Sequence, residues 1–492
     1  MQKVKKVLKS DLGKSISSGY LLFLVNNVVA LFLTPYMLQF ISKEEYGFYI
    51  LCVDFLAWVG FLEFGTNKVI ESKAAHLIAN ENYEGLNKTF NSSFFFQMLI
   101  GLLIIPFYFF LINIGISKNK LDHLYIIIAI FAISAGLSVF RNLFSSVIIA
   151  SKKIHLDNRI QLAMNVLNYS MILLLVPFVG VLGLAIINLV AIILMLVRSN
   201  YRVKQLFPSF KINRSFFDQN ELKSLISHGV YFSLGSVATL LLLKIDSFII
   251  GREYSLELVA SYYITVKLFM LIQKVIEMAV NNFRPHIAHL FGKKEFEKIK
   301  LFYELILFSV ICISTLSVTV IIFINRYFVE LWVGKGFYIG DLFTLLFGYY
   351  IISNLITLPS RIVLVSSLYK IKSLNFSRVF EGIFRIGLIL LLLKSTSINI
   401  LPITSILSIF TFGILFFHFQ LRDYFKKHHQ DSVKTYLPLS ILILSIPAIF
   451  TYFNLSIIYN LITIPTVLVI FALFLKVKWN DFKKLSSVVF KN

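Results

Sequence analysis

Long apolar runs separated by short polar segments dominate the hydrophobic pattern of the chain. A helix that crosses the hydrocarbon core of a bilayer needs about 20 largely apolar residues. Fourteen runs reach or approach this length, at residues 15–40, 46–65, 92–115, 124–150, 161–179, 181–197, 228–250, 259–283, 301–324, 341–365, 377–393, 402–420, 438–453 and 456–475. The pattern predicts an all-α, polytopic membrane protein with about 14 transmembrane helices. The even number of helices predicts both termini on the same side of the membrane.

Composition supports the same class of protein. Of the 492 residues, 58% are hydrophobic and 15% are charged, whereas about 25% are charged in an ordinary soluble domain. A globular protein cannot bury this much apolar surface, and a disordered chain does not carry it. A soluble enzyme, a secreted scaffold and a disordered hub are therefore excluded. The two cysteines, Cys52 and Cys312, lie within apolar runs and indicate neither a disulfide framework nor a metal site.

The net charge of +22 is explained by the orientation of the chain in the membrane. With the N-terminus in the cytoplasm, the cytoplasmic segments carry 33 of the 47 Lys and Arg residues and the outer loops carry 7. This is the bias of the positive-inside rule. It predicts cytoplasmic N- and C-termini and makes a nucleic-acid partner unnecessary.

The loops and an internal repeat predict two six-helix halves. The longest cytoplasmic loop, residues 198–227, separates an N-terminal lobe (1–197) from a C-terminal lobe (228–420), and residues 421–492 add a loop, two helices and a basic tail. A shift of 213 residues aligns AAHLIANENYEG (74–85) with IAHLFGKKEFEK (287–298). Two repeats in the same orientation imply a two-fold axis along the membrane normal.

Several loose motifs carry a resemblance to a known family. Thr34-Pro35 lies in the first helix, Glu45-Tyr46-Gly47-Phe48-Tyr49 begins the second, and Glu63-Phe64-Gly65 ends it. Together with YFSLGSVATLLLLKIDSFIIG (231–251) and ASYYITVKLFMLIQKV (260–275), this run resembles the polysaccharide-unit flippases, or Wzx-type O-antigen flippases. That family belongs with the multidrug exporters of the MATE type and the lipid II flippases in the MOP superfamily.

The resemblance implies a fold of two six-helix bundles around a central cavity. It also implies the transport of undecaprenyl-pyrophosphate-linked oligosaccharide repeat units, of the O-antigen, lipopolysaccharide or capsule type, across the bacterial inner membrane. The expected protein is a transporter and not an enzyme. No cofactor is expected. Because the chain carries no nucleotide-binding motif, energy would come from an ion gradient, with H⁺ or Na⁺ as the coupling ion, or from removal of the product on the far side. A polysaccharide polymerase and other assembly proteins are candidate partners.

Ionisable residues inside the predicted spans are candidates for the transport pathway, because charges in a membrane are costly and usually face a cavity or a partner. Seven cations and five acids qualify: Arg141, Lys244, Lys267, Lys274, Arg361, Arg378, Arg385, Asp54, Glu63, Asp246, Glu277 and Glu381. Of these, Arg361 and Arg378 are close enough to helix ends for their charges to reach the interface.

The eighth predicted helix carries a stripe of charge. Lys267 and Lys274 are seven residues apart and share one face, and Glu277 lies one turn beyond Lys274. The stripe either attracts a pyrophosphate or an acidic sugar, or it consists of a Lys274–Glu277 ion pair beside a solvated Lys267. The repeat also sets Asp54 opposite Lys267, which makes a pair between the two lobes geometrically plausible.

A second stripe lies in the eleventh predicted helix, where Arg378, Glu381 and Arg385 follow at i, i+3 and i+7. It forms either an internal salt-bridged ladder or, through its excess positive charge, a site for an anionic head group. Arg141 lies inside the fourth helix, and a role in lining the cavity is expected for it. The predicted cationic cavity comprises Arg141, Lys244, Lys267, Lys274 and Arg385.

Lys244 and Asp246 are two residues apart and point in different directions, so they cannot pair on one helix. At least one of them needs a more distant partner. The carboxylates Asp54, Asp246, Glu277 and Glu381 are the candidates for ion coupling or gating. Asn26 and Asn27 either contact sugar hydroxyls or bridge helices, the second being the commoner use.

Three other functions remain open. No nucleotide-binding, hydrolase or zinc-protease motif occurs, and no metal site is predicted. A cation-coupled drug exporter of the MATE type would favour a cavity richer in acids than in bases. A membrane polysaccharide polymerase or ligase usually needs a large outer loop, which this chain lacks. A lipid II flippase matches the predicted number of helices.

Overall fold

The structure, a computed structural model, describes residues 11–116, 124–392 and 397–429. Within these ranges the chain is helical with short connections and contains no strand. The contacts divide the chain into two compact units, Met1–Ser261 and Tyr262–Asn492. The predicted all-α class is confirmed.

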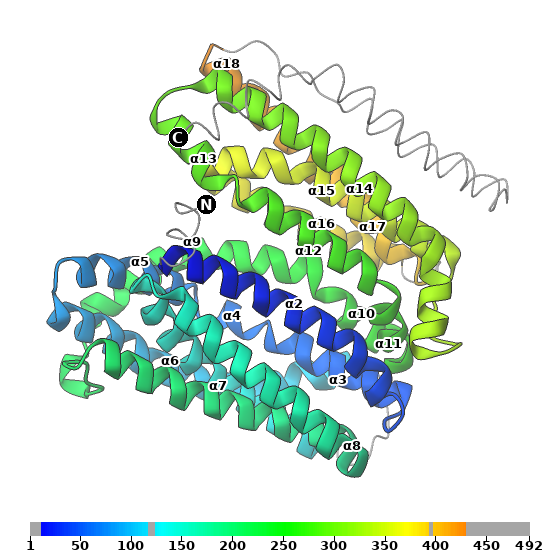
Figure 1. Ribbon diagram of the computed structural model, residues 1–492, viewed down its shortest axis with the longest axis horizontal. Coiled ribbons are helices and arrows are strands. Elements are labelled where there is room, and N and C mark those ends of the chain that lie inside the picture. The colour runs from blue at the N-terminus through cyan, green and yellow to red at the C-terminus, as the bar shows by residue number, and fades with distance from the viewer. Residues whose placement is uncertain (1–10, 117–123, 393–396, 430–492) are drawn as a thin grey trace, which may run out of the picture. The chain divides into compact units, whose positions relative to one another are not determined.

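Unit 1 contains nine α-helices, one short 3₁₀ turn and the first part of a tenth α-helix within its described residues (Figure 1). In chain order they are α2 (Asp11–Met37), α3 (Lys43–Leu56), α4 (Val59–Leu62), α5 (Thr66–Ala79), α6 (Tyr83–Gly115), α7 (Leu124–Ala150), α8 (Ile154–Leu206), η1 (Arg214–Phe216), α9 (Gln219–Leu243), α10 (Ile245–Glu253) and α11 (Leu256–Thr265). The boundary between the units falls within α11.

Unit 2 continues with α12 (Lys267–Asn281), α13 (Arg284–Gly292), α14 (Phe296–Val333), α15 (Asp341–Ser366), α16 (Ile371–Leu392), α17 (Ile400–Ser408), the π-helix η2 (Ile409–Leu415) and α18 (Phe416–Lys427). The helix α15 is the most deeply buried of the long helices in this unit. It packs against α12, α14 and α17.

Seven described helices, or runs of consecutive helices, are long and apolar enough to cross a membrane, and the bent helix α9 would make eight. The chain is therefore a multi-pass membrane protein. The predicted count of 14 is not confirmed, since several predicted spans are interrupted or carry several charges, as α16 does with Arg378, Glu381 and Arg385. The predicted helices 438–453 and 456–475 lie outside the described residues.

The helix α8 contains a break that separates two predicted spans. Gly180 adopts φ +57 and ψ −138, which is not a helical conformation. Only glycine adopts this region without strain, because it has no Cβ. The break lies between the predicted spans 161–179 and 181–197 and confirms that they are two segments.

The internal repeat is confirmed by the backbone. At a shift of 213 residues, the start of α3 falls on that of α11, the end of α5 on that of α13, and the start of α6 on that of α14. The turns after α5 and α13 also agree in detail. Glu81 and Lys294 both have positive φ. The next residues, Asn82 and Glu295, each donate a backbone N–H to the carbonyl five residues earlier, at 2.9 and 3.0 Å. This 6→1 bond is typical of the Schellman motif that ends a helix.

The predicted linker, residues 198–227, packs on unit 1 through side-chain amides of α6. Asn87 donates to the carbonyl of Ser209 at 3.0 Å and accepts from the backbone N–H of Lys211 at 3.0 Å. One turn later, Asn91 bonds the carbonyl of Lys211 and the N–H of Asn213, at 2.8 and 2.9 Å. The two amides therefore act as a backbone-like ladder that fixes an otherwise irregular segment.

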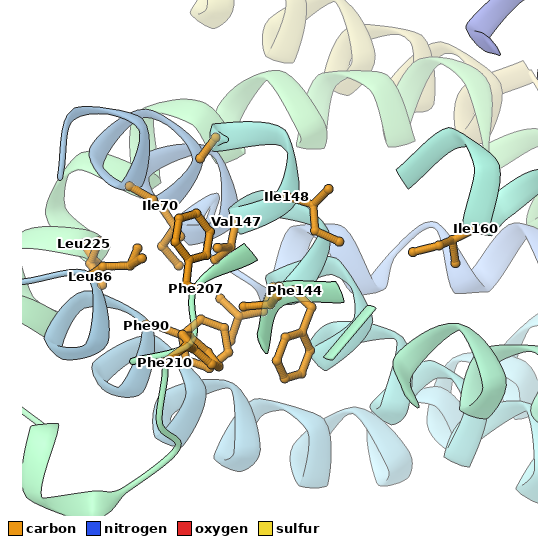
Figure 2. Close-up of a cluster of buried hydrophobic side chains, with 14 residues drawn as sticks. Ile70, Leu86, Phe90, Phe144, Val147, Ile148, Ile160, Phe207, Phe210 and Leu225 are labelled. Atoms are coloured by element: carbon orange, nitrogen blue, oxygen red, sulfur yellow. The ribbon is translucent and has the colours of Figure 1, made fainter. Parts of the chain in front are cut away.

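The same segment supplies part of the hydrophobic core of unit 1. Figure 2 shows Phe207, Phe210 and Leu225 among buried side chains from α5, α6, α7 and α8. The rings of Phe90 and Phe210 meet edge to face with centroids 4.6 Å apart, a favourable aromatic geometry. The predicted end of the N-terminal transport lobe at 197 and start of the C-terminal lobe at 228 stay a prediction. In the structure, residues 198–227 belong to the compact unit 1.

A close backbone contact joins α9 to the turn between α4 and α5. A Cβ on Gly65, whose φ is +66, would collide with the carbonyl oxygen of Gly229 in α9. A Cβ on Gly229 would collide in turn with the carbonyl oxygen of Phe64. Reciprocal glycines of this kind allow helices in membrane proteins to approach closely.

Candidate functional site

The predicted seventh span is broken at a charged residue. Lys244 lies between α9 and α10 with φ −121 and ψ −8, and its N–H bonds the carbonyl of Leu240. Its ammonium pairs with the carboxylate of Asp54 in α3. The prediction that at least one of Lys244 and Asp246 needs a more distant partner is confirmed, since Lys244 is the residue that pairs elsewhere. Asp246 itself is buried in the first turn of α10.

The Lys244–Asp54 pair is expected to stabilise unit 1 by a measurable amount. Asp54→Asn and Lys244→Gln should each destabilise the protein by about 1–2 kcal/mol, because each leaves a partly buried charge without its partner. The double variant should lose less than the sum of the two. The measurement is a double-mutant cycle of thermal stability in detergent. Lys14→Gln, which breaks the exposed Lys14–Asp11 pair of 3.6 Å, is the control and should have little effect. Strict additivity at Lys244 and Asp54 would contradict the pairing.

The predicted eighth span is also broken, at Val266, and α12 begins with Lys267. The Thr265 carbonyl, which precedes the break, accepts a hydrogen bond of 3.0 Å from the Asn325 amide in α14. The Lys267 ammonium lies 5.2 Å from the centre of the Tyr263 ring. The interruption is local, because Val266 itself donates to the carbonyl of Tyr262 and accepts from the N–H of Met270, both at 3.0 Å.

Lys274 and Glu277 do not form the ion pair that was one of the two interpretations of this stripe. Glu277 instead accepts a hydrogen bond of 2.9 Å from the Gln273 amide. Lys274 is exposed, and no carboxylate of the described residues lies within ion-pairing distance of it. Lys267 and Lys274 thus keep their positive charges available on α12.

A second charged cluster of unit 2 lies on α15 and α16. Arg378 pairs with Glu381 at 2.7 Å within α16, and Arg385, on the same helix, is almost fully buried. Arg361 of α15 lies close enough to interact electrostatically with Arg378, Glu381 and Glu277. We refer to Arg361, Arg378, Glu381 and Arg385 as the arginine cluster. Its three guanidinium groups outnumber its one carboxylate, so the cluster carries an excess of positive charge. The nearby Glu277 offsets one of these charges and leaves the cluster positive.

Arg361 contributes an unsatisfied hydrogen-bond donor to the arginine cluster. Its Nε is buried and has no hydrogen-bond partner among the residues that the structure describes. A buried donor without a partner is costly, and it is an unusual feature that calls for a ligand or a water. Sequence reasoning assigned Arg361 to the membrane interface and so missed this feature.

In unit 1, Arg141 of α7 is paired with Asp157 of α8 at 3.3 Å. Asp157 is buried and also accepts a hydrogen bond of 2.7 Å from Gln161. Arg141 was predicted to be a lone cation that lines a cavity, and its partner Asp157 was not predicted. Its Nε is nevertheless buried without a hydrogen-bond partner in the described part of the chain.

A buried carboxylate, that of Glu63, is held by side-chain amides, one of which belongs to Asn142, the residue that follows Arg141. Glu63 accepts hydrogen bonds from the amides of Asn142 and Asn67, at 3.0 and 2.6 Å. Asn67 in turn accepts from Gln97 of α6 at 2.8 Å. We refer to Glu63, Asn67, Gln97 and Asn142 as the amide network. Within the described residues no cation lies within 4 Å of the Glu63 carboxylate, and Gln97 Oε1 is buried without a partner.

The predicted site residues thus fall into separate groups. Unit 1 contains the Lys244–Asp54 pair, Asp246 and Arg141, and unit 2 contains the α12 stripe and the arginine cluster with Arg385 and Glu381. The amide network was not predicted, because Glu63 was named only as an acid within a span. The helix bridge expected for Asn26 is confirmed, since it accepts hydrogen bonds from Asn165 and Tyr169 of α8 at 2.8 and 3.1 Å.

A known family matches this sequence. The family described as polysaccharide biosynthesis protein covers residues 12–291, more than half of the 492-residue chain. The chain belongs to the polysaccharide biosynthesis protein family. The match includes all of the described residues of unit 1 except Asp11, together with α12 and nearly all of α13. A comparison with curated protein sequences finds no match.

Solved structures agree with the family on the fold. An inward-facing multidrug resistance transporter of the MATE family in the MOP superfamily is 15% identical, with a TM-score of 0.67 over 82% of this chain and 96% of that chain. The lipid II flippase MurJ, in an inward closed conformation, is 14% identical, with a TM-score of 0.66 over 94% of this chain and 98% of that one. The outward-facing MATE structure gives a TM-score of 0.57 at 15% identity, over 86% and 98% of the two chains.

The resemblance stated from the sequence is confirmed for the polysaccharide biosynthesis family and for the fold. This member of the polysaccharide biosynthesis protein family has the fold of MOP transporters and of a lipid II flippase. The fold is one that known transporters share. The nature of the transported molecule depends on the site residues.

Proposed function

We propose that the protein flips lipid-linked oligosaccharide repeat units from the cytoplasmic to the periplasmic leaflet of the bacterial inner membrane. The substrate class is an undecaprenyl-pyrophosphate-linked saccharide of the O-antigen or capsule type. The two lobes alternate in access, both termini lie in the cytoplasm, and the lipid tail stays in the bilayer. The proposal extends the family membership of the chain to a specific substrate.

The observation that carries the proposal is the unsatisfied, buried Nε of Arg361 in a cluster with excess positive charge. Guanidinium groups bind phosphate oxygens through paired, charge-assisted hydrogen bonds. A pyrophosphate would offer acceptors to Arg361 and would offset the positive charge that Glu381 leaves unbalanced. A cationic drug would meet repulsion from the same groups, which disfavours the alternative of a MATE-type drug exporter.

The α12 stripe supports an anionic substrate in the same unit. Lys267 and Lys274 lie on one helix without carboxylate partners in the described residues, and lysine binds phosphate as a point charge. In our proposal they attract the pyrophosphate or acidic sugars. Arg141 and Lys244, which are paired with Asp157 and Asp54, would contribute to the cavity only after those pairs open.

We further propose that Glu63 couples transport to an ion, H⁺ or Na⁺. An unpaired carboxylate buried in a membrane protein is costly, so a proton or a small cation is expected to accompany it. The neutral amides of Asn67 and Asn142 hold the carboxylate without neutralising it. Asp54 and Glu381 are less suited, because each is paired with a cation. Asp246 and Glu277 remain candidates for coupling or gating.

Surface polysaccharide in cells provides the test. In a strain whose own flippase is deleted, Lys267→Ala and Arg141→Ala are expected to restore less surface polysaccharide than the unmodified protein. Removing a charged group that contacts the substrate should lower the amount of surface polysaccharide about tenfold or more. This is the loss expected when one charge-assisted hydrogen bond is removed. Lys204→Ala, at an exposed lysine of α8, is the matched control. Unchanged polysaccharide at normal protein abundance in both variants would contradict the cationic-cavity proposal.

A polymerase and other assembly proteins are the partners expected in the cell.

A further inference from the structure

A pocket of about 760 Å³ opens in unit 1, and its lining includes no residue of the amide network or of the Lys244–Asp54 pair. Its volume lies within the range of about 300–1,000 Å³ that is usual for small-ligand sites. The walls come from the start of α2, one face of α5, the turn between α7 and α8, and α9. The charge distribution of the loops predicts that this end of the unit faces the cytoplasm.

One face of α5 forms a polar wall of the pocket. Lys68, Glu71, Ser72 and Ala75 follow at i, i+3, i+4 and i+7 and all line it. The opposite face of α5 carries Ile70 and Ala74, which are fully buried in the core of unit 1 (Figure 2). The helix is therefore fixed by its apolar face and presents its polar face to the pocket.

The other walls combine a hydroxyl, a cation and exposed apolar groups. The Ser15 hydroxyl donates to the Asp11 carbonyl at 2.6 Å and accepts from the His155 N–H at 3.2 Å, which ties α2 to α8. Lys152 lies at the tip of the α7–α8 turn with φ +62. Phe232 of α9 lines the pocket and is 53% exposed.

The charges that line the pocket cancel. Lys68 and Lys152 are opposed by Asp11 and Glu71, and Lys68 and Glu71 are paired at 2.8 Å. A bare anion such as free phosphate would gain little from such a lining. A polyhydroxyl ligand suits it, because each sugar hydroxyl both donates and accepts, while the C–H faces of the rings pack on apolar side chains such as Phe232.

We propose that this pocket is a docking site for the saccharide part of the lipid-linked substrate on the cytoplasmic side. The inference rests on the proposed function and adds to it a specific sugar-binding surface within unit 1. The carboxylates, lysines and serines bind the hydroxyls, and Phe232 contacts a sugar ring. Phospholipid head groups are the competing occupant, and the test distinguishes the two.

The first test is protection of a cysteine from a maleimide. Ser72→Cys is introduced into the full chain. The two native cysteines, Cys52 and Cys312, are buried and form no disulfide, and both are replaced by alanine. The purified protein in nanodiscs is labelled with the maleimide in the presence of one of three ligands. These are undecaprenyl-pyrophosphate-linked saccharide, undecaprenyl phosphate and added phosphatidylethanolamine. At a ligand concentration about ten times Kd, occupancy should slow labelling about tenfold. Glu84→Cys, exposed at the start of α6, should label at the same rate throughout.

The expected result is protection of Ser72→Cys by the lipid-linked saccharide and not by the sugar-free lipids. Equal protection by undecaprenyl phosphate or by phosphatidylethanolamine would assign the pocket to a lipid head group and overturn the proposal. Absence of protection by every ligand would overturn it as well.

A kinetic measurement separates this inference from the proposed function. Phe232→Ala should raise the half-saturating concentration of lipid-linked saccharide in a translocation assay about three- to tenfold, the size of one aromatic contact, with an unchanged maximal rate. If the unmodified protein translocates the substrate and Phe232→Ala behaves identically, the pocket proposal fails alone. If the unmodified protein translocates no lipid-linked saccharide while Ser72→Cys is still protected, the proposed function fails and the sugar site stands.

Discussion

Arg361→Gln is expected to reduce translocation of a lipid-linked saccharide about 10- to 100-fold while the protein remains folded. Arg361 carries a buried Nε without a hydrogen-bond partner among the described residues, so the variant removes no internal bond of that atom. The loss corresponds to about 1.4–2.7 kcal/mol of substrate stabilisation, which is typical of a charged hydrogen bond to an anion. The Arg378–Glu381 pair beside it remains intact.

The measurement compares initial translocation rates in vesicles that contain equal amounts of folded protein. Arg361→Lys keeps the charge but loses the planar pair of donors, and it should recover only part of the rate. Arg326→Gln, which breaks an exposed Arg326–Glu330 pair at 3.1 Å, is the matched control and should transport normally. A full rate in Arg361→Gln would show that the arginine cluster is structural.

Glu63→Gln is expected to abolish the dependence of transport on an ion gradient. The glutamine has nearly the same shape but cannot take up a proton or carry the charge that holds a cation. It also sets an NH₂ group against an amide donor of Asn67 or Asn142, and an unmatched buried donor costs about 1–3 kcal/mol. A lower thermal stability should therefore accompany the loss of coupling.

The test measures translocation in vesicles with an imposed pH or Na⁺ gradient and without one. The unmodified protein should respond to one of the two gradients, and Glu63→Gln should respond to neither. Glu253→Gln, at a partly exposed carboxylate paired with Arg252, controls for the loss of a charge elsewhere. If Glu63→Gln keeps the full response, the coupling group lies elsewhere, and Asp246 and Glu277 become the next candidates.

The sequence predicted the fold class, the polysaccharide family and the repeat because each depends on local or periodic signals. Apolar runs of about 20 residues identify spans, and the turns at Glu81 and Lys294 repeat a local backbone motif. The breaks at Lys244 and Val266 were not predicted. Each affects a single residue within an apolar run, so the hydropathy of the window hardly changes.

The partners of the membrane charges were predicted only in part. Residues two apart on a helix face different directions, which showed that Lys244 or Asp246 needs a distant partner. It did not show that the residue is Lys244 or that Asp54, 190 residues away, supplies the partner. Arg361 was assigned to the interface from its distance to a helix end, whereas its Nε is buried and the charges of Arg378, Glu381 and Glu277 act on it. Such contacts depend on tertiary structure, which a single sequence does not encode locally.

The direct test of the central claim is a leaflet-sidedness assay with the purified protein in lipid vesicles. Undecaprenyl-pyrophosphate-linked saccharide is loaded on one leaflet, and its appearance on the other is followed by the access of a lectin or an oxidant to the sugar. Our account predicts transfer that requires the protein, is faster for the saccharide-linked lipid than for undecaprenyl phosphate, and is strongly reduced by Arg361→Gln. Folded protein that leaves the saccharide on its original leaflet, with or without an ion gradient, would contradict the account.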